Sequence, residues 1–105
     1  MTLNGFRRIA LSMPNATEES HMGHPDFLVK GKIFATMCSP DERWCMVKLP
    51  PALQRTLIKG KPTVFVPASG AWGRQGSTLA LLAKIDTATL RPIMEAAWRN
   101  VAAKR

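Results

Sequence analysis

Two histidines and two cysteines are the residues of this sequence best suited to metal chemistry. His21 and His24 lie in the segment HMGH, and Cys38 and Cys45 follow. Structural zinc sites usually take their ligands from tight pairs of cysteines or histidines. Cys38 and Cys45 are too widely spaced for such a pair. We therefore predict no metal site and interpret the four residues as loop and strand residues, with a four-ligand zinc site as the less favoured alternative.

The sequence also lacks the usual patterns of catalysis and of nucleotide-cofactor binding. Glu18 and Glu19 are adjacent, so on a strand their carboxylates would point to opposite faces and would not act as a pair. The glycines of GAWGRQG match neither the phosphate loop nor the dinucleotide-binding fingerprint. Ser69 and Ser77 lack the frame of a nucleophile elbow. We predict that the protein is not an enzyme and needs no cofactor.

The charge of the chain points instead to polyanions. Fifteen lysines and arginines against seven acidic residues give a net charge of +8 and a pI near 10.4. Contact between such a surface and nucleic acid is favoured because each neutralised phosphate releases counterions. We therefore predict DNA as a possible partner, held mainly through its phosphates. The residues predicted to contact nucleic acid are Lys30, Lys32, Arg43, Lys48, Trp72 and Arg74.

Trp72 has two interpretations. It stands between glycines and close to Arg74 in SGAWGRQG, which suits an exposed ring that stacks on a base. Alternatively the ring folds back and closes one end of the core while the glycines make the turn. Burial is the favoured interpretation, because large aromatic side chains usually bury most of their area. Trp98 falls on an apolar helical stripe and is predicted to lie in the core.

Two other classes of function stay open. A small-molecule site could lie between the sheet and the helices, in a mainly apolar pocket lined by Phe27, Phe34, Trp44 and Trp72. A protein-interaction adaptor would instead present an exposed apolar patch or form a stable dimer.

The elements that would position these residues follow from periodicity and from turn residues. A first helix begins after Thr2 and ends before Pro14, and a second begins at Pro50 or Pro51 and ends before Gly60. Asp86 caps a final helix in which Pro92 either lies in the first turn or separates a short turn from the rest.

Strands are predicted between these helices. Residues 26–37 read as a hairpin with Lys30 and Gly31 as its turn and Phe27 opposite Phe34. Further strands are expected at 43–49, 64–66 and 78–85, and a short edge strand at 17–20. The segment 69–76 is expected to be the turn into the last strand.

These elements predict an α+β fold with two layers. An antiparallel sheet of about five to six strands would carry the N-terminal and C-terminal helices, within one domain spanning residues 1–105. We see no apolar stretch long enough for a membrane span or a signal peptide, so we expect a cytoplasmic monomer that does not enter membranes. The two cysteines would then stay thiols.

Several stretches together are similar to a known family. FRRIALSMPNATEES, GHPDFLVKGKIFATM, MVKLPP and the final GAWGRQGSTLALLAKIDTATLRPIMEAAWRNVA occur in an order and spacing that resembles the MmcQ/YjbR family of small bacterial proteins, over nearly the whole chain. The resemblance implies a CyaY-like fold, similar to the double-wing DNA-binding domain of a phage transcription factor, which is why members are often labelled DNA-binding. It implies no active site.

The chain departs from the family pattern at one position. Many members have an aromatic residue at the beginning of the last strand, where this chain has Ser77. Trp72 and Arg74 are the nearby alternatives for a stacking role.

Overall fold

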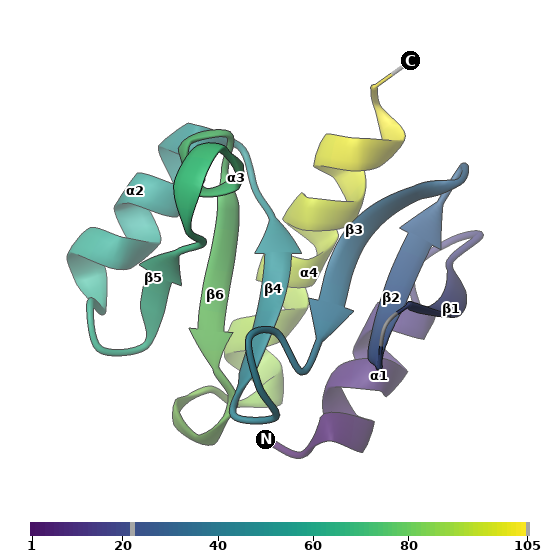
Figure 1. The fold of residues 1–105 in the computed structure, drawn as a ribbon, viewed down its shortest axis with the longest axis horizontal. Coiled ribbons are helices and arrows are strands. Elements are labelled where there is room, and N and C mark those ends of the chain that lie inside the picture. The colour runs from purple at the N-terminus through teal and green to yellow at the C-terminus, as the bar shows by residue number, and fades with distance from the viewer. Residues whose placement is uncertain (22, 105) are drawn as a thin grey trace.

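The computed structural model describes residues 1–21 and 23–104, and it has the predicted α+β architecture (Figure 1). A sheet of six strands runs in the order β1-β2-β3-β4-β6-β5, and every neighbouring pair is antiparallel. The elements in chain order are α1 (Leu3–Leu11), β1 (Thr17–His21), β2 (His24–Val29), β3 (Lys32–Met37), β4 (Trp44–Lys48), α2 (Pro51–Gly60), β5 (Phe65–Pro67), α3 (Gly70–Arg74), β6 (Ser77–Leu81), the 3-10 turn η1 (Leu82–Lys84) and α4 (Thr87–Ala102).

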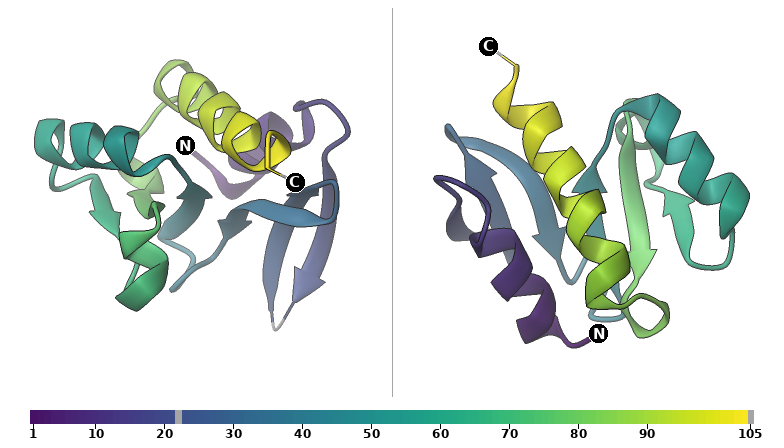
Figure 2. Two further views of the ribbon diagram at one scale, coloured as in Figure 1. Left: turned by 90° about the horizontal axis from the view of Figure 1, so that it is seen from above. Right: turned by 180° about the vertical axis from the view of Figure 1, so that it is seen from behind.

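Helices α1 and α4 lie side by side on one face of the sheet, with α4 crossing it diagonally (Figure 2). The core fills the space between this helical layer and the sheet, and its largest fully buried side chains include Phe6, Phe27, Phe34 and Met94. Short α3 lies on the other side of the sheet, where β1 and β2 also curl away from α4 (Figure 2). The sheet therefore has one face covered by α1 and α4 and one face that is open between α3 and β2.

The N-terminal caps of α1 and α4 form as the sequence predicts. The hydroxyl of Thr2 accepts a hydrogen bond from the backbone N–H of Gly5, and the carboxylate of Asp86 accepts one from Thr89. Each bond satisfies an N–H at a helix start that has no partner within the helix. Pro92 fits neither prediction. It lies inside α4, beyond the first turn that begins at Thr87, and the helix continues through it to Ala102.

The hairpin between β2 and β3 has the predicted turn but not the predicted register. Lys30 and Gly31 both have positive φ, 54° and 74°, as a tight two-residue hairpin turn requires. Leu28 pairs with Ile33, but Phe27 then pairs with Ala35. A β-bulge at Phe34 therefore replaces the predicted pairing of Phe27 with Phe34, and both phenylalanines lie in the core.

Three other boundaries differ from the sequence prediction. Segment 69–76 contains the short helix α3, where only a turn was expected. Strand β6 ends at Leu81, because the chain bends into a 3-10 turn that places Leu82 and Ile85 in the core. Gly60 is the last residue of α2 and not the residue after it. Within the described residues, no helix has the length and apolar character to cross a membrane.

Candidate functional site

The open face of the sheet is built by alternation along β4 and β6. Cys45 and Val47 of β4 point into the core, so Met46 and Lys48 lie on the opposite, half-buried face. Met46 pairs with Leu79 of β6, and Lys48 pairs with Ser77. An apolar surface therefore runs across the middle of the sheet and ends at a lysine.

The β-bulge adds two residues of β3 to this face. Strict alternation would put Ile33 and Thr36 on opposite faces, but the extra residue at Phe34 brings both to the open one, where they line the same hollow. The hydroxyl of Thr36 donates to the carboxylate of Asp26 over 2.9 Å, and both side chains are buried. The bulge thus sets a polar pair beside the apolar strip.

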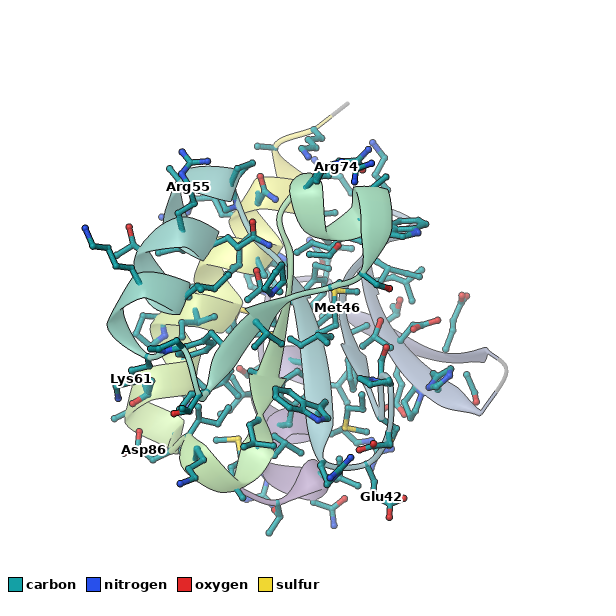
Figure 3. The ribbon with its side chains drawn as sticks, turned by 60° about the vertical axis from the view of Figure 1, so that its left-hand side comes forward. Glu42, Met46, Arg55, Lys61, Arg74 and Asp86 are labelled. Carbon is teal, nitrogen blue, oxygen red and sulfur yellow. The ribbon has the colours of Figure 1, made fainter. Side chains whose placement is uncertain are left out.

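A hollow of about 320 Å³ occupies this face and is lined in part by Met46, which Figure 3 shows below α3. Two more hollows adjoin it, one of about 110 Å³ beside Trp72 and Lys104 and one of about 320 Å³ beside Lys32 and Lys104. All three share Lys48 as a lining residue, and none of the described residues that line them is acidic. We refer to these three hollows together as the basic groove.

Trp72 forms one wall of the basic groove and is not buried in the core. Its side chain is 63% exposed, so the favoured prediction that it closes one end of the core is wrong. Trp72 belongs to the short helix α3, which is tightly packed against the chain and directs the ring outward. A Cβ on Gly73 would overlap the carbonyl oxygen of Ala68, so only glycine lets α3 approach this closely.

A buried amide holds α3 from behind. The side chain of Gln54, on α2, donates hydrogen bonds to the carbonyl oxygens of Gly73 at 2.9 Å and Ser77 at 3.1 Å. Gln54 is buried, so these bonds are shielded from competing water. The exposed Trp72 ring therefore stands on a fixed support.

Lys48 lies at the centre of the basic groove. Its Nζ is 5.3 Å from the centroid of the Trp72 ring, within the range of a cation–π contact. Burial lowers the pKa of Lys48 most, the nearby charge of Lys104 lowers it further, and Asp26 partly opposes both. A half-buried ammonium beside a second ammonium is a place where an anion is stabilised.

Four more cations lie at the same end of the sheet. Lys30 and Lys32 belong to the β2–β3 hairpin, and Lys104 follows α4 (Figure 1). Arg74 ends α3 and is labelled in Figure 3. Lys30 donates from Nζ to the carbonyl oxygen of Ala102 over 3.2 Å, which joins the hairpin to the end of α4. Of the six predicted nucleic-acid contacts, five therefore gather at one end of the molecule.

Arg43 is the exception. It precedes β4 at the opposite end of that strand from Lys48. Its guanidinium binds the carboxylate of Asp41 at 2.9 Å, and the hydrogen bonds from Arg43 lower the pKa of Asp41 to about 2. Arg43 already has an anionic partner and is remote from the basic groove.

The four aromatic residues predicted to share a pocket do not come together. Phe27 and Phe34 are fully buried in the core between sheet and helices. Trp44 projects from the open face of β4, and Trp72 stands on α3. The bulge keeps Phe34 on the core face of the sheet, and the alternation of β4 places Trp44 on the open face. The two phenylalanines and the two tryptophans therefore lie on opposite sides of the sheet.

The structure also places Trp98 and the two cysteines of the less favoured zinc alternative. Trp98 is half-buried at the edge of the core and donates from Nε1 to the carbonyl oxygen of Pro14 over 2.9 Å. Cys38 directly follows Met37, which pairs with Cys45 across β3 and β4, and Cys45 is buried with its pKa raised to about 12 by that burial. No group of three or more potential ligands capable of holding a metal occurs among the residues that the structure describes.

Sequence reasoning did not select Lys104 or Gln54. Lys104 reaches Lys48 only because α4 packs across the sheet, where Asn100 donates to the carbonyl oxygen of Lys48 over 3.0 Å. Gln54 interrupts the apolar stripe of α2, between Leu53 and Leu57. A polar residue at an inward position of a helix is the signal that could have identified it.

Two comparisons with known proteins give matches. The model of the YjbR family matches residues 11–100. The crystal structure of Deinococcus radiodurans protein DR2400, with a DUF419 domain, has a similar fold, with a TM-score of 0.82 and 15% sequence identity over 98% of this chain and 80% of that one. None of the curated proteins matches the sequence. The structural likeness supports the fold and carries no function with it.

Proposed function

Since the chain belongs to the YjbR family, whose name specifies no activity, the function must be argued from the site, and we propose that the protein binds nucleic acid through the basic groove. The proposal is of a binding protein and not of an enzyme. The phosphates of the nucleic acid would contact Lys32, Lys48 and Lys104, with Lys30 and Arg74 at the margins. The further likeness to MmcQ and CyaY, the monomeric state and the cytoplasmic location stay predictions.

One observation carries the proposal: lysines line the three adjoining hollows, and the described lining of these hollows contains no carboxylate. The charge of Lys104 acts against the charged form of Lys48, with Asp26 only partly opposing it, and this repulsion is relieved when phosphates bind among the lysines. Two cations outside the groove have acidic partners: Arg7 binds Glu18 at 2.9 Å, and Arg43 binds Asp41. Among the described residues, the lysines that line the groove form no such ion pair, which suits the groove to a polyanion.

Contacts of this kind give affinity without much sequence selectivity. Phosphates are the same at every step of a nucleic acid, so lysines that bind them fix the position of the protein but do not read bases. We expect affinities for unrelated sequences to be similar at equal salt.

The test is a fluorescence anisotropy titration with labelled nucleic acid at low and rising salt. Wild-type protein should bind, with an affinity that falls as salt rises. Lys48→Ala should weaken binding to unrelated sequences by similar factors. Arg43→Ala is the matched control, since it removes the same charge outside the groove, and it should bind like the wild type. Absence of binding at low salt, or binding that salt does not weaken, would exclude the proposal.

A second candidate function has a specific observation in its favour. The hollow of about 320 Å³ below α3 has an apolar floor, a wall formed by Trp72, and Lys48 at one end. This combination is typical of a small-molecule site. The sequence had suggested a pocket between the sheet and the helices, but this hollow lies on the open face of the sheet. A library of ring-containing acids screened for increases in melting temperature tests this candidate.

A further inference from the structure

We infer that the basic groove accepts an unpaired base of a single strand, stacked against Trp72, with the strand's phosphates on Lys48 and Lys104. This inference rests on the proposed function, because it specifies which form of nucleic acid the groove takes. It commits to single-stranded nucleic acid in preference to a duplex. Four features of the groove support it.

The first feature is the support of Trp72. An exposed tryptophan on a loose loop loses conformational freedom when a ligand orders it, and that loss weakens binding. Here α3 is fixed by Gln54 and by the close approach of Gly73 to Ala68. The ring is therefore exposed for contact and already held in place, as a stacking platform should be.

The second feature is the chemistry of the floor. Ile33, Met46 and Leu79 present apolar, half-buried side chains to the 320 Å³ hollow. Phosphates and sugars gain little from such a surface, but the flat face of a base does. In a duplex the base faces are stacked on one another, and only the base edges reach the grooves. The apolar floor of the hollow therefore suits an unstacked base, whose flat face is free to contact it.

The third feature is the position of charge beside the ring. Lys48 lies 5.3 Å from the centroid of the Trp72 ring and lines all three hollows. A base against Trp72 would place its own phosphate within reach of this ammonium. The arrangement joins a stacking surface to a phosphate contact, which are the two components of single-strand recognition.

The fourth feature separates a strand from a free nucleotide, which offers the same ring and phosphate. The groove continues past Lys48 into the two hollows that share Lys104, and one of them reaches Lys32 at the β2–β3 hairpin. A single nucleotide would occupy the first hollow and leave these lysines unpaired. A strand would continue along them.

The experiment compares one labelled strand of about twelve nucleotides, its duplex with the complementary strand, and unlabelled mononucleotide as competitor. Trp72→Leu removes the ring but keeps an apolar side chain at an exposed position, so the variant should fold with an unchanged melting temperature. We expect it to lose at least about fivefold in affinity for the single strand, a typical minimum for one stacking contact. Its affinity for the duplex should fall by a clearly smaller factor, because a duplex offers the ring no free base face. Lys48→Ala should weaken both forms.

Other outcomes separate the two proposals. If wild-type and Trp72→Leu proteins bind the single strand equally, or if only the duplex binds, the inference fails and nucleic-acid binding stands. If neither form binds at low salt, the proposed function itself fails. If mononucleotide competes as well as the strand at equal nucleotide concentration, the site takes free nucleotides and the inference fails. Trp72→Phe should keep more single-strand affinity than Trp72→Leu, because it retains an aromatic face.

Discussion

At the scale of single residues, Lys48 is the side chain on which stability and binding have opposite requirements. Burial and the charge of Lys104 both lower its pKa, so its charged form is destabilised by folding. Asp26 is the acid that opposes this effect, and Trp72 offers a cation–π contact. An uncharged side chain would suit the folded protein better, whereas a phosphate requires the charge.

A pH titration of Lys48 tests this conflict. The unfolded chain, with the ordinary lysine pKa of 10.5, binds more protons than the folded protein above the folded pKa. Lys48 should therefore increase the free energy of unfolding as pH rises from its folded pKa to 10.5. NMR of the lysine side chains should give a pKa below 10.5 for free protein and a higher one with a bound strand. A free pKa of 10.5, or one that the strand leaves unchanged, would contradict this.

Residue types were predictable from the sequence here, but their surroundings were not. Lys30, Lys32, Lys48 and Arg74 were selected for charge, and they lie at one end of the sheet, at the β2–β3 hairpin and at the ends of β4 and α3 (Figure 1). Arg43 was selected for the same reason, and its ion pair with Asp41 sets it apart. The exposure of Trp72 depends on how closely α3 can approach Ala68, which propensity alone does not reveal.

At the scale of elements, α3 acts as a support whose position depends on two glycines. Gly73 lies against Ala68, and a Cβ on Gly76 would overlap the carbonyl oxygen of Leu49. Gly76 also has φ +113°, a conformation that other residues rarely adopt. The sequence suggested that the glycines make a turn. The structure adds that they let a short helix pack against the end of the sheet.

Replacing Gly60 and Gly73 by alanine, one at a time, separates the effect of helix propensity on stability from the effect of close packing. Gly60→Ala meets open space at the end of α2, so it should stabilise the protein by up to about 1 kcal/mol. Gly73→Ala meets the carbonyl oxygen of Ala68, so it should destabilise by about 1–3 kcal/mol. Urea unfolding of both variants measures the difference. Equal effects of the two substitutions would show that α3 is not held as described.

The strands show where prediction from local sequence ends. The turn at Lys30 and Gly31 was predictable because its residues alone determine it. The bulge at Phe34 was not, since it depends on which partner residues β2 presents across the pair. This bulge places Ile33 and Thr36 on one face, so the floor of the groove was hidden from the sequence even though each strand was predicted.

At the scale of the whole molecule, the arrangement of charge is more informative than its amount. The fifteen basic residues were spread along the sequence, and several remain away from the groove, such as Lys59 and Lys61 on and after α2. The α+β architecture with helices on one face was predictable from periodicity. The open face and the meeting of Lys48 with Lys104 required the packing of α4 across the sheet.

Two double variants with the same net charge test whether arrangement matters. Lys32→Ala with Lys48→Ala removes two lysines of the groove, and Lys59→Ala with Lys61→Ala removes two lysines away from it. Each phosphate contact to duplex DNA contributes about −0.9 to the slope of log affinity against log salt, so the first variant should make that slope shallower by about two. The second should leave it unchanged. Anisotropy titrations from about 50 mM to about 200 mM salt measure both slopes. If the two variants shift the slope equally, the protein attracts nucleic acid through its overall charge, and the basic groove is not the binding surface.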